Sequence, residues 1–168
     1  EAGDRVYATM RDPSKAGGLE ELDGVTVLTL DVTDGESVAK AVEEALRRAG
    51  RLDVVVNNAG IDTLGAIEDI AFDKVREIME TNFFGALRVT RRALPAMRAQ
   101  GAGTIVMVTS LAAVFSSYGE GAYAASKRAL EGAAEVLQNE AARWGIRVLV
   151  IRPGYVATPM AGKSIPGS

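Results

Sequence analysis

The residues best suited to chemistry in this sequence are a serine, a tyrosine and a lysine. Ser110 follows an apolar run typical of a strand, and Tyr123 and Lys127 stand four residues apart at the start of a helical pattern. On a helix this spacing puts both side chains on one face. A neighbouring ammonium stabilises a phenolate and lowers its pKa from about 10. Such a tyrosine exchanges a proton with an alcohol or carbonyl oxygen, while a serine hydroxyl orients the substrate.

The Tyr-x-x-x-Lys pair also has an ordinary structural interpretation, because a surface helix with its aromatic ring on the core gives the same pattern. The absence of histidine and cysteine narrows the chemistry. It excludes a Ser-His-Asp triad, a catalytic thiolate, disulfides and metal sites built on His or Cys. We therefore expect no metal, and proton transfer near neutral pH falls to Asp, Glu, Lys, Tyr or a cofactor.

The composition is that of an ordinary globular protein. With 48% hydrophobic and 24% charged residues, residues 1–168 suit one domain. A net charge of -3 argues against a nucleic-acid partner. No apolar run reaches the roughly 18 residues of a membrane span. The absence of cysteine is compatible with the cytoplasmic location that we expect.

Hydrophobic patterning predicts alternating strands and helices. Apolar runs predict strands at residues 5–9, 25–30, 54–56, 104–109 and 147–151. Apolar residues at helical spacing predict helices at residues 36–48, 72–80, 83–98 and 123–143. Asp34 is the expected N-cap of the first helix and Gly50 its stop. We expect an α/β fold, a doubly wound parallel sheet in a three-layer α/β/α arrangement.

Several motifs occur together in one order and spacing. They are Asn57-Asn58-Ala59-Gly60, Ser110 thirteen residues before Tyr123, Tyr123-Ala-Ala-Ser126-Lys127, and Pro153-Gly154. On these motifs the chain resembles the short-chain dehydrogenase/reductase family over essentially its whole length. The resemblance implies a Rossmann-like fold. It also implies an enzyme that moves a hydride between a nicotinamide cofactor and an alcohol or carbonyl.

The resemblance implies four catalytic residues. The family's tyrosine falls on Tyr123, its serine on Ser110, and its lysine, which also binds the nicotinamide ribose, on Lys127. The family's asparagine, which holds a water that links the lysine to solvent, falls on Asn82. An amide inside an apolar helical stretch needs a partner in any case. The alternative for Asn82 is therefore a polar residue that bends the helix or satisfies the core.

The resemblance also places the cofactor. Its binding positions fall on Arg11, Asp31, Val32, Asn57, Ala59, Gly60, Tyr123, Lys127, Pro153, Gly154, Val156 and Thr158. Asp31 is expected to meet the adenine amino group, although a capping role is the alternative. The turn at residues 57–60 is expected to brace the sheet and border the adenosine. Pro153-Gly154 is expected to lie against the nicotinamide, with Val156 holding the carboxamide and Thr158 closing over the cofactor, although Pro-Gly is also a common turn.

The end of the second family strand bears on cofactor choice. Enzymes that choose NAD usually place a carboxylate there, on the ribose 2′-hydroxyl. Here Met10 is followed by Arg11, whose guanidinium suits a 2′-phosphate. We therefore expect NADP(H), with NAD(H) as the alternative because a one-residue shift would bring Asp12 to that place. The segment at 6–12 resembles the branch with hydroxysteroid and retinol dehydrogenases, which indicates a small, lipophilic alcohol or ketone substrate.

Two parts of the family pattern have no counterpart in this sequence. These are the first strand with its Thr-Gly-x-x-x-Gly-x-Gly turn, and the substrate region beyond Thr158. In the family's sheet the first strand lies centrally, between the second and fourth strands. We therefore expect a central gap with unpaired backbone groups and exposed apolar faces. A polypeptide of only these 168 residues is expected to bind cofactor weakly and to show little or no activity.

The helical stretches at 83–98 and 123–143 correspond to those that pair between subunits in the family. The second is rich in alanine, which allows close helix approach, although packing on its own sheet is the alternative. We expect a homodimer or homotetramer. Two other functions stay open. One is a non-catalytic dinucleotide-binding sensor or scaffold, against which the intact Ser110, Tyr123, Lys127 and Asn82 argue. The other is dehydration or epimerisation through a transient hydride.

Overall fold

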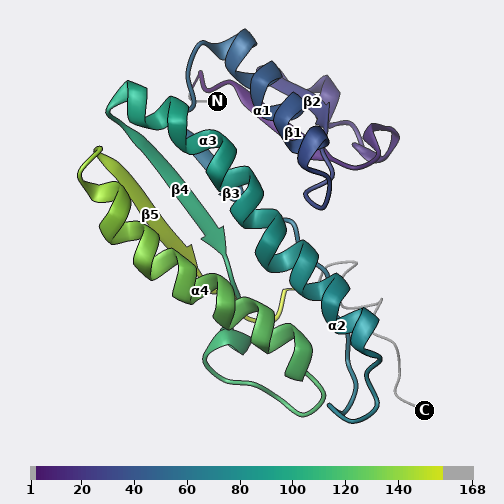
Figure 1. The fold of residues 1–168 in the computed structure, drawn as a ribbon. Helices are drawn as coiled ribbons and strands as arrows, with labels where there is room; N and C mark the ends of the chain where they lie inside the picture. Colours follow the sequence, from purple (N-terminus) through teal and green to yellow (C-terminus); the bar gives the residue numbers. More distant parts are fainter. Residues whose placement is uncertain (1–2, 157–168) are drawn as a thin grey trace.

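A computed structural model describes residues 3–156, and in this part strands alternate with helices as the sequence predicts (Figure 1). The strands are β1 (Val6–Met10), β2 (Val25–Thr29), β3 (Val54–Asn57), β4 (Gly103–Val108) and β5 (Ile146–Ile151). The helices are α1 (Gly35–Ala49), α2 (Phe72–Met79), α3 (Ala86–Gln100) and α4 (Gly121–Ala142). A π-helical turn covers Glu80–Gly85, and short 3₁₀ turns cover Pro13–Lys15, Leu19–Glu21 and Leu111–Ala113. The predicted strands and helices are confirmed, with ends that differ by at most three residues.

Helix α1 begins and ends at the residues that the sequence indicates. The Asp34 carboxylate accepts a hydrogen bond of 2.8 Å from the backbone N–H of Glu36, and so satisfies one of the free donors of the first turn. Gly50 ends the helix with φ at 77°, a left-handed conformation that glycine adopts without a steric penalty. The predicted N-cap and stop are both confirmed.

The two helices predicted at 72–80 and 83–98 are one continuous helix. Helix α2 passes into α3 through the π turn, whose flanking residues keep right-handed helical backbone. A π turn contains one extra residue, which shifts the apolar pattern without breaking the helix. The interruption in the periodicity around Asn82 therefore reflects a local widening of the helix rather than a loop.

All strand pairs are parallel, but they form two sheets. β1 pairs with β2, and β3, β4 and β5 form the second sheet in that order. Within residues 3–156 no strand pairs with the second edge of β1 or of β3, so backbone groups along both edges lack a strand partner. The predicted central gap therefore lies between β1 and β3.

The helices cover one side of the strands. In Figure 1, α1, α3 and α4 lie on the same side. Val55, Ile105 and Val148 are aligned across the second sheet and pack in the core under α3 and α4. On the opposite side, Val54 and Val56 are each 56% exposed. The α/β class is confirmed. Of the three predicted layers, the described residues form the sheet and one helical layer.

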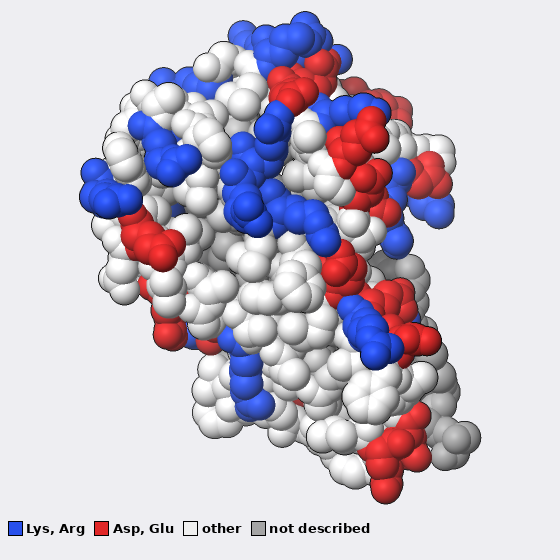
Figure 2. All heavy atoms as spheres, viewed as in Figure 1, with Lys and Arg blue, Asp and Glu red and all other residues white. Residues whose placement is uncertain are grey.

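Contacts between α1 and α3 hold the two sheets together. Arg92 of α3 forms an ion pair with Glu43 of α1. Arg88 of α3 donates a 3.2 Å hydrogen bond to the carbonyl of Val32, just after β2. Figure 2 shows basic side chains gathered over these helices, with acidic ones beside them. The two sheets are therefore joined through the helical layer and not through strand pairing.

The close approach of Gly85 to Val32 at this junction gives the first testable prediction. A methyl group added at Gly85 would lie 2.7 Å from Val32 Cγ2, well inside van der Waals contact. We expect Gly85→Ala to lower the free energy of unfolding by about 1–3 kcal/mol, the usual result of overpacking. The measurement is thermal or urea unfolding followed by circular dichroism.

Gly132→Ala is the matched control, because Gly132 lies inside α4 with open space around it. There the same substitution should stabilise the protein by about 0.5–1 kcal/mol through helix propensity. Equal effects at the two positions would contradict the close packing of Gly85 on Val32.

Candidate active site

Tyr123 and Lys127 lie on the first two turns of α4 and face the carboxyl end of β4. The Lys127 ammonium is 5.7 Å from the centre of the Tyr123 ring. Lys127 is only 4% exposed, and its Nζ donates a 3.0 Å hydrogen bond to the carbonyl of Val108, the last residue of β4. The structure thus brings the predicted tyrosine and lysine together at the end of a strand, where ligands bind in parallel sheets.

Ser110 joins this pair from the other side. It follows β4 and is the N-cap of the short 3₁₀ turn Leu111–Ala113. Its Oγ accepts a 3.1 Å hydrogen bond from the backbone N–H of Ala112 within that turn. Ser110 also lies close enough to Tyr123 to lower the pKa of its phenol. All three predicted catalytic side chains therefore meet at one place.

Burial controls the protonation of the pair. Burial lowers the pKa of Lys127 to about 8, so the lysine still carries a proton at neutral pH. Burial also raises the pKa of Tyr123, and this effect exceeds the lowering by Ser110. The sequence analysis expects the lysine to depress the tyrosine pKa. In this arrangement that expectation is wrong, because desolvation of the phenolate outweighs the favourable interactions.

Asn82 is fully buried in the π turn and connects the strand side of the site to α4. Its Oδ1 accepts a 2.8 Å hydrogen bond from the backbone N–H of Ile61, and its Nδ2 donates to the Ile61 carbonyl at 2.9 Å. The same Nδ2 donates to Ser126 Oγ at 3.0 Å, and Ser126 in turn donates to the carbonyl of Tyr123. The amide therefore positions the loop after β3 against the start of α4.

Gly60 fits into the space beside this amide. A Cβ atom at residue 60 would lie 3.3 Å from Asn82 Oδ1 and 3.4 Å from Lys127 Nζ. Glycine therefore lets the backbone after β3 approach both side chains closely. The predicted Asn57 is also buried, but it points into the core, where its Nδ2 donates to Thr90 Oγ1 of α3 at 3.0 Å. Asn57 thus braces the sheet against the helix.

The sequence analysis missed Asp62. This half-buried carboxylate follows Ile61, the residue that Asn82 fixes. Burial raises the pKa of Asp62 itself, while its negative charge raises the pKa of Tyr123 and of Lys127. In the sequence it resembles an ordinary turn residue, and Thr63 does donate a backbone hydrogen bond to its carboxylate. Only the folding of this loop over α4 brings it near the site.

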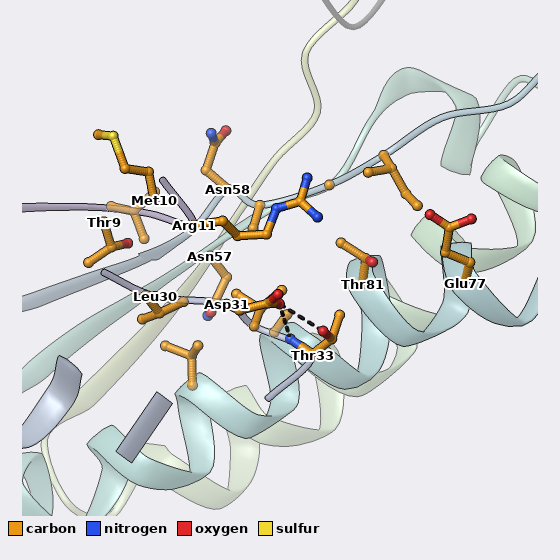
Figure 3. Close-up of a pocket in the computed structure, with 17 residues that line it drawn as sticks. Thr9, Met10, Arg11, Leu30, Asp31, Thr33, Asn57, Asn58, Glu77 and Thr81 are labelled. Atoms are coloured by element: carbon orange, nitrogen blue, oxygen red, sulfur yellow. Dashed lines mark hydrogen bonds between the residues drawn. The ribbon is translucent and has the colours of Figure 1, made fainter. Parts of the chain in front are cut away.

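A cavity of about 340 Å³ lies at the carboxyl ends of β1, β2 and β3 (Figure 3). It is lined by predicted cofactor residues from all three strand ends, namely Arg11, Asp31, Val32, Asn57, Ala59 and Gly60. Because β1 and β3 belong to different sheets, the walls of the cavity come from both sides of the central gap. The position matches the place where parallel α/β sheets bind nucleotides.

Arg11 and Asp31 face this cavity from β1 and β2. In Figure 3 the Arg11 side chain extends over the cavity, and Asp31 bonds to Thr33. The Asp31 carboxylate accepts hydrogen bonds from the Thr33 backbone and hydroxyl, which lower its pKa, so the capping alternative also describes its contacts. Asp12 does not line the cavity. Its carboxylate caps the 3₁₀ turn through Ser14.

The predicted nicotinamide segment lies beside Ser110 and not in this cavity. The Pro153 carbonyl accepts a 3.0 Å hydrogen bond from the backbone N–H of Leu111, and Gly154 packs near the Leu111 side chain. Val156 is exposed and contributes nothing to the cavity wall. Thr158 lies outside the described residues. The structure thus places Pro153 and Gly154 next to Leu111, which follows the predicted catalytic Ser110, and leaves Val156 apart from the cavity.

Comparison with known proteins decides the family. The sequence matches the short chain dehydrogenase family over residues 1–167. The chain belongs to the short-chain dehydrogenase family. It is 38% identical to retinol dehydrogenase 8 of Bos taurus over 95% of this chain and 52% of that protein. It thus spans about half the length of that relative.

Solved structures of the family share its Rossmann-like fold. A short-chain dehydrogenase from Streptomyces avermitilis superposes with a TM-score of 0.87 at 38% identity, covering 99% of this chain and 63% of that one. A gluconate 5-dehydrogenase from Burkholderia cenocepacia, in complex with NADP and tartrate, superposes with a TM-score of 0.87 at 27% identity, covering 93% and 63%. The chain thus shares the fold of this family, and the gluconate 5-dehydrogenase is a neighbour whose structure contains NADP. Among residues 3–156, no helix is long and apolar enough to cross a membrane.

The hydrogen bonds of Asn82 give the second testable prediction. Asn82→Ala leaves the backbone N–H and carbonyl of Ile61 without partners in a poorly solvated place. We expect a loss of about 2 kcal/mol or more in the free energy of unfolding, measured by urea denaturation. Asn139→Ala is the control, because Asn139 is exposed on α4 and should change stability by less than about 0.5 kcal/mol. Similar losses at both positions would contradict the bridging role of Asn82.

Proposed function

We propose that this short-chain dehydrogenase transfers a hydride between NADP(H) and a small, lipophilic alcohol or ketone, with Ser110, Tyr123, Lys127 and Asn82 as its catalytic residues. The observation that carries the proposal is the meeting of Ser110, Tyr123 and Lys127 at the end of β4. A sensor or scaffold needs a dinucleotide site but has no use for this proton-transfer group. The similarity to retinol dehydrogenase 8 supports a lipophilic substrate.

The nicotinamide, when bound, supplies or accepts the hydride. The Tyr123 hydroxyl gives a proton to the carbonyl oxygen during reduction and takes it back during oxidation. Burial keeps the pKa of Tyr123 above its ordinary value, so the phenol carries its proton at neutral pH, the form that acts as the general acid in carbonyl reduction. Ser110 holds the same oxygen by a hydrogen bond, and the charged Lys127 stabilises the phenolate that forms. Asn82 holds the loop beside Lys127.

The test uses a completed protein, since this chain covers 63% of the Streptomyces avermitilis dehydrogenase. In this completed protein, the chain is joined at both ends to segments of the Streptomyces avermitilis dehydrogenase, namely those that precede and follow the region matched by this chain. NADPH oxidation is followed with retinal and a set of lipophilic ketones. Tyr123→Phe should lower kcat at least about a hundredfold, the usual contribution of a general acid, and leave NADPH affinity nearly unchanged.

Tyr118→Phe is the matched control for this experiment, because Tyr118 is 92% exposed in the loop before α4. It should retain full turnover. A completed protein that binds NADPH, reduces none of the carbonyls and is unaffected by Tyr123→Phe would favour the sensor or scaffold instead.

The preference for NADP(H) rests on which residue faces the cavity after β1. Arg11 lines the cavity, whereas the Asp12 carboxylate is used in the cap of the next turn. A guanidinium in this place attracts a 2′-phosphate, and no carboxylate from β1 repels it. The gluconate 5-dehydrogenase, a structural relative that contains NADP, supports the same choice.

Arg11→Ala in the completed protein tests the cofactor preference. We expect NADPH affinity to fall about tenfold or more, the value of a charge-assisted hydrogen bond, while NADH affinity changes little. Arg5→Ala is the control, because Arg5 lies at the opposite end of β1 and bonds to the Arg48 carbonyl. Fluorescence titration with NADPH and with NADH gives the ratio of the two dissociation constants. An unchanged ratio in Arg11→Ala would refute the role of Arg11.

The central gap also affects cofactor binding. Because the cavity walls belong to two sheets that share no strand pairing, the 168-residue chain alone should bind both nucleotides more weakly than the completed protein.

We also propose that the protein forms a homodimer or homotetramer and is located in the cytoplasm. Val136 on α4 and Trp144 just after it are partly exposed, and they offer apolar surface for a second copy.

A further inference from the structure

Glu131 is a carboxylate of α4 that the proposed chemistry does not use. It lies one helical turn beyond Lys127, and its side chain is only 12% exposed. Arg152, just after β5, holds it with two hydrogen bonds, from Nε to Oε1 at 2.8 Å and from Nη2 to Oε2 at 3.0 Å. This two-bond geometry fixes the relative orientation of the groups as well as their distance.

A second contact joins Glu131 to β4. The buried hydroxyl of Thr109 lies 2.7 Å from Glu131 Oε1, with the Ile151 carbonyl as a second acceptor at 3.1 Å. Thr109 directly precedes Ser110, and its backbone N–H also donates to the Ile151 carbonyl at 2.8 Å. The carboxylate therefore contacts the residue that leads into the catalytic serine.

The three partners belong to three different segments around the site. Thr109 leads into Ser110, and Arg152 leads into Pro153 and Gly154. Glu131 itself extends from the helix that carries Tyr123 and Lys127. By contrast, the comparable bonds between Arg47 and Glu44 join neighbours within α1 and connect no separate parts of the protein.

The carboxylate stays ionised in this position. Burial raises the pKa of Glu131, but hydrogen bonds from Arg152 and Thr109 and the charge of Arg152 together leave it below the ordinary value. Glu131 is the more buried member of the pair, while Arg152 is 44% exposed, so the carboxylate depends on its two partners more than the guanidinium depends on Glu131. The contact is therefore suited to hold a geometry rather than to exchange protons.

We propose that Glu131 is a positioning residue for hydride transfer, which locks the segments entering Ser110 and Pro153-Gly154 to the helix of Tyr123 and Lys127. This inference rests on the function proposed above. The nucleotide cavity is lined by residues from β1 to α3, and among the described residues none comes from β4, β5 or α4. Loss of Glu131 should therefore reduce turnover without a comparable loss of nucleotide affinity.

The experiment compares four variants of the completed protein. Glu131→Gln keeps the size of the side chain but removes its charge and its second acceptor for Arg152. Thr109→Val keeps the shape of the threonine and removes only its hydroxyl, so it tests the same link if Glu131→Gln fails to fold. Thr109→Ser restores the hydroxyl. Glu44→Gln removes the carboxylate that pairs with Arg47 and Arg48 on α1, a helix that carries none of the predicted catalytic residues.

Turnover and NADPH affinity are measured separately, at a temperature well below the unfolding midpoint of every variant. Glu131→Gln and Thr109→Val should each lower kcat about tenfold or more, because small displacements of reacting groups are costly to the rate. Their NADPH dissociation constants should stay within about threefold of the parent, since the residues expected to hold the adenosine and its 2′-phosphate line a cavity on other strands. Thr109→Ser and Glu44→Gln should keep parental kcat.

The outcomes separate this proposal from the one it rests on. An active parent whose Glu131→Gln and Thr109→Val variants keep their kcat would overturn the positioning role and leave the hydride-transfer function intact. Equal losses of kcat in Glu44→Gln would overturn it too, because they would show a general effect of losing an ion pair. A parent that binds NADPH and reduces no carbonyl would overturn both proposals.

Discussion

The arrangement of the site depends on one buried amide. Asn82 sits in a π turn without solvent contact, and an amide in such a place must find partners within the protein. It finds them in the backbone of Ile61 and the hydroxyl of Ser126. These bonds connect the loop after β3, the long helix pair α2–α3 and the first turns of α4. Gly60, which lines the cavity, lies against both Asn82 and Lys127, so helix α4 and the cavity are positioned relative to each other at this point.

Because the strands form two separate sheets, contacts between helices connect the two halves of the described structure. With β1 and β3 unpaired to each other, the connection between the two sheets passes through α1 and α3. Gly85, at the end of the π turn, also packs closely on Val32, and Val32 lines the cavity. The cavity is therefore supported by helix packing on one side and open along the strand edges.

Two kinds of polar group surround the catalytic side chains. Burial favours the neutral form of both Tyr123 and Lys127: it raises the pKa of the phenol and lowers the pKa of the ammonium. The charge of Asp62 raises both pKa values. Glu131 and Arg152 instead form a charged pair whose pKa shifts keep both partners ionised. The first group is suited to exchange protons and the second to hold segments in place. The same helix, α4, carries members of both groups one turn apart.

The sequence by itself determined the α/β class, the order of strands and helices, and the ends of α1 at Asp34 and Gly50, because periodicity and capping are local properties. It also indicated Ser110, Tyr123 and Lys127 through their types and spacing, and Asn82 through the resemblance to the family. Only the tertiary structure decided that the helix runs unbroken through Asn82, that burial raises the pKa of Tyr123, and that Asp62 and Glu131 lie at the site. These features arise from contacts between segments far apart in the chain. Desolvation and hydrogen bonding across such contacts depend on three-dimensional packing, which residue spacing along one chain does not contain.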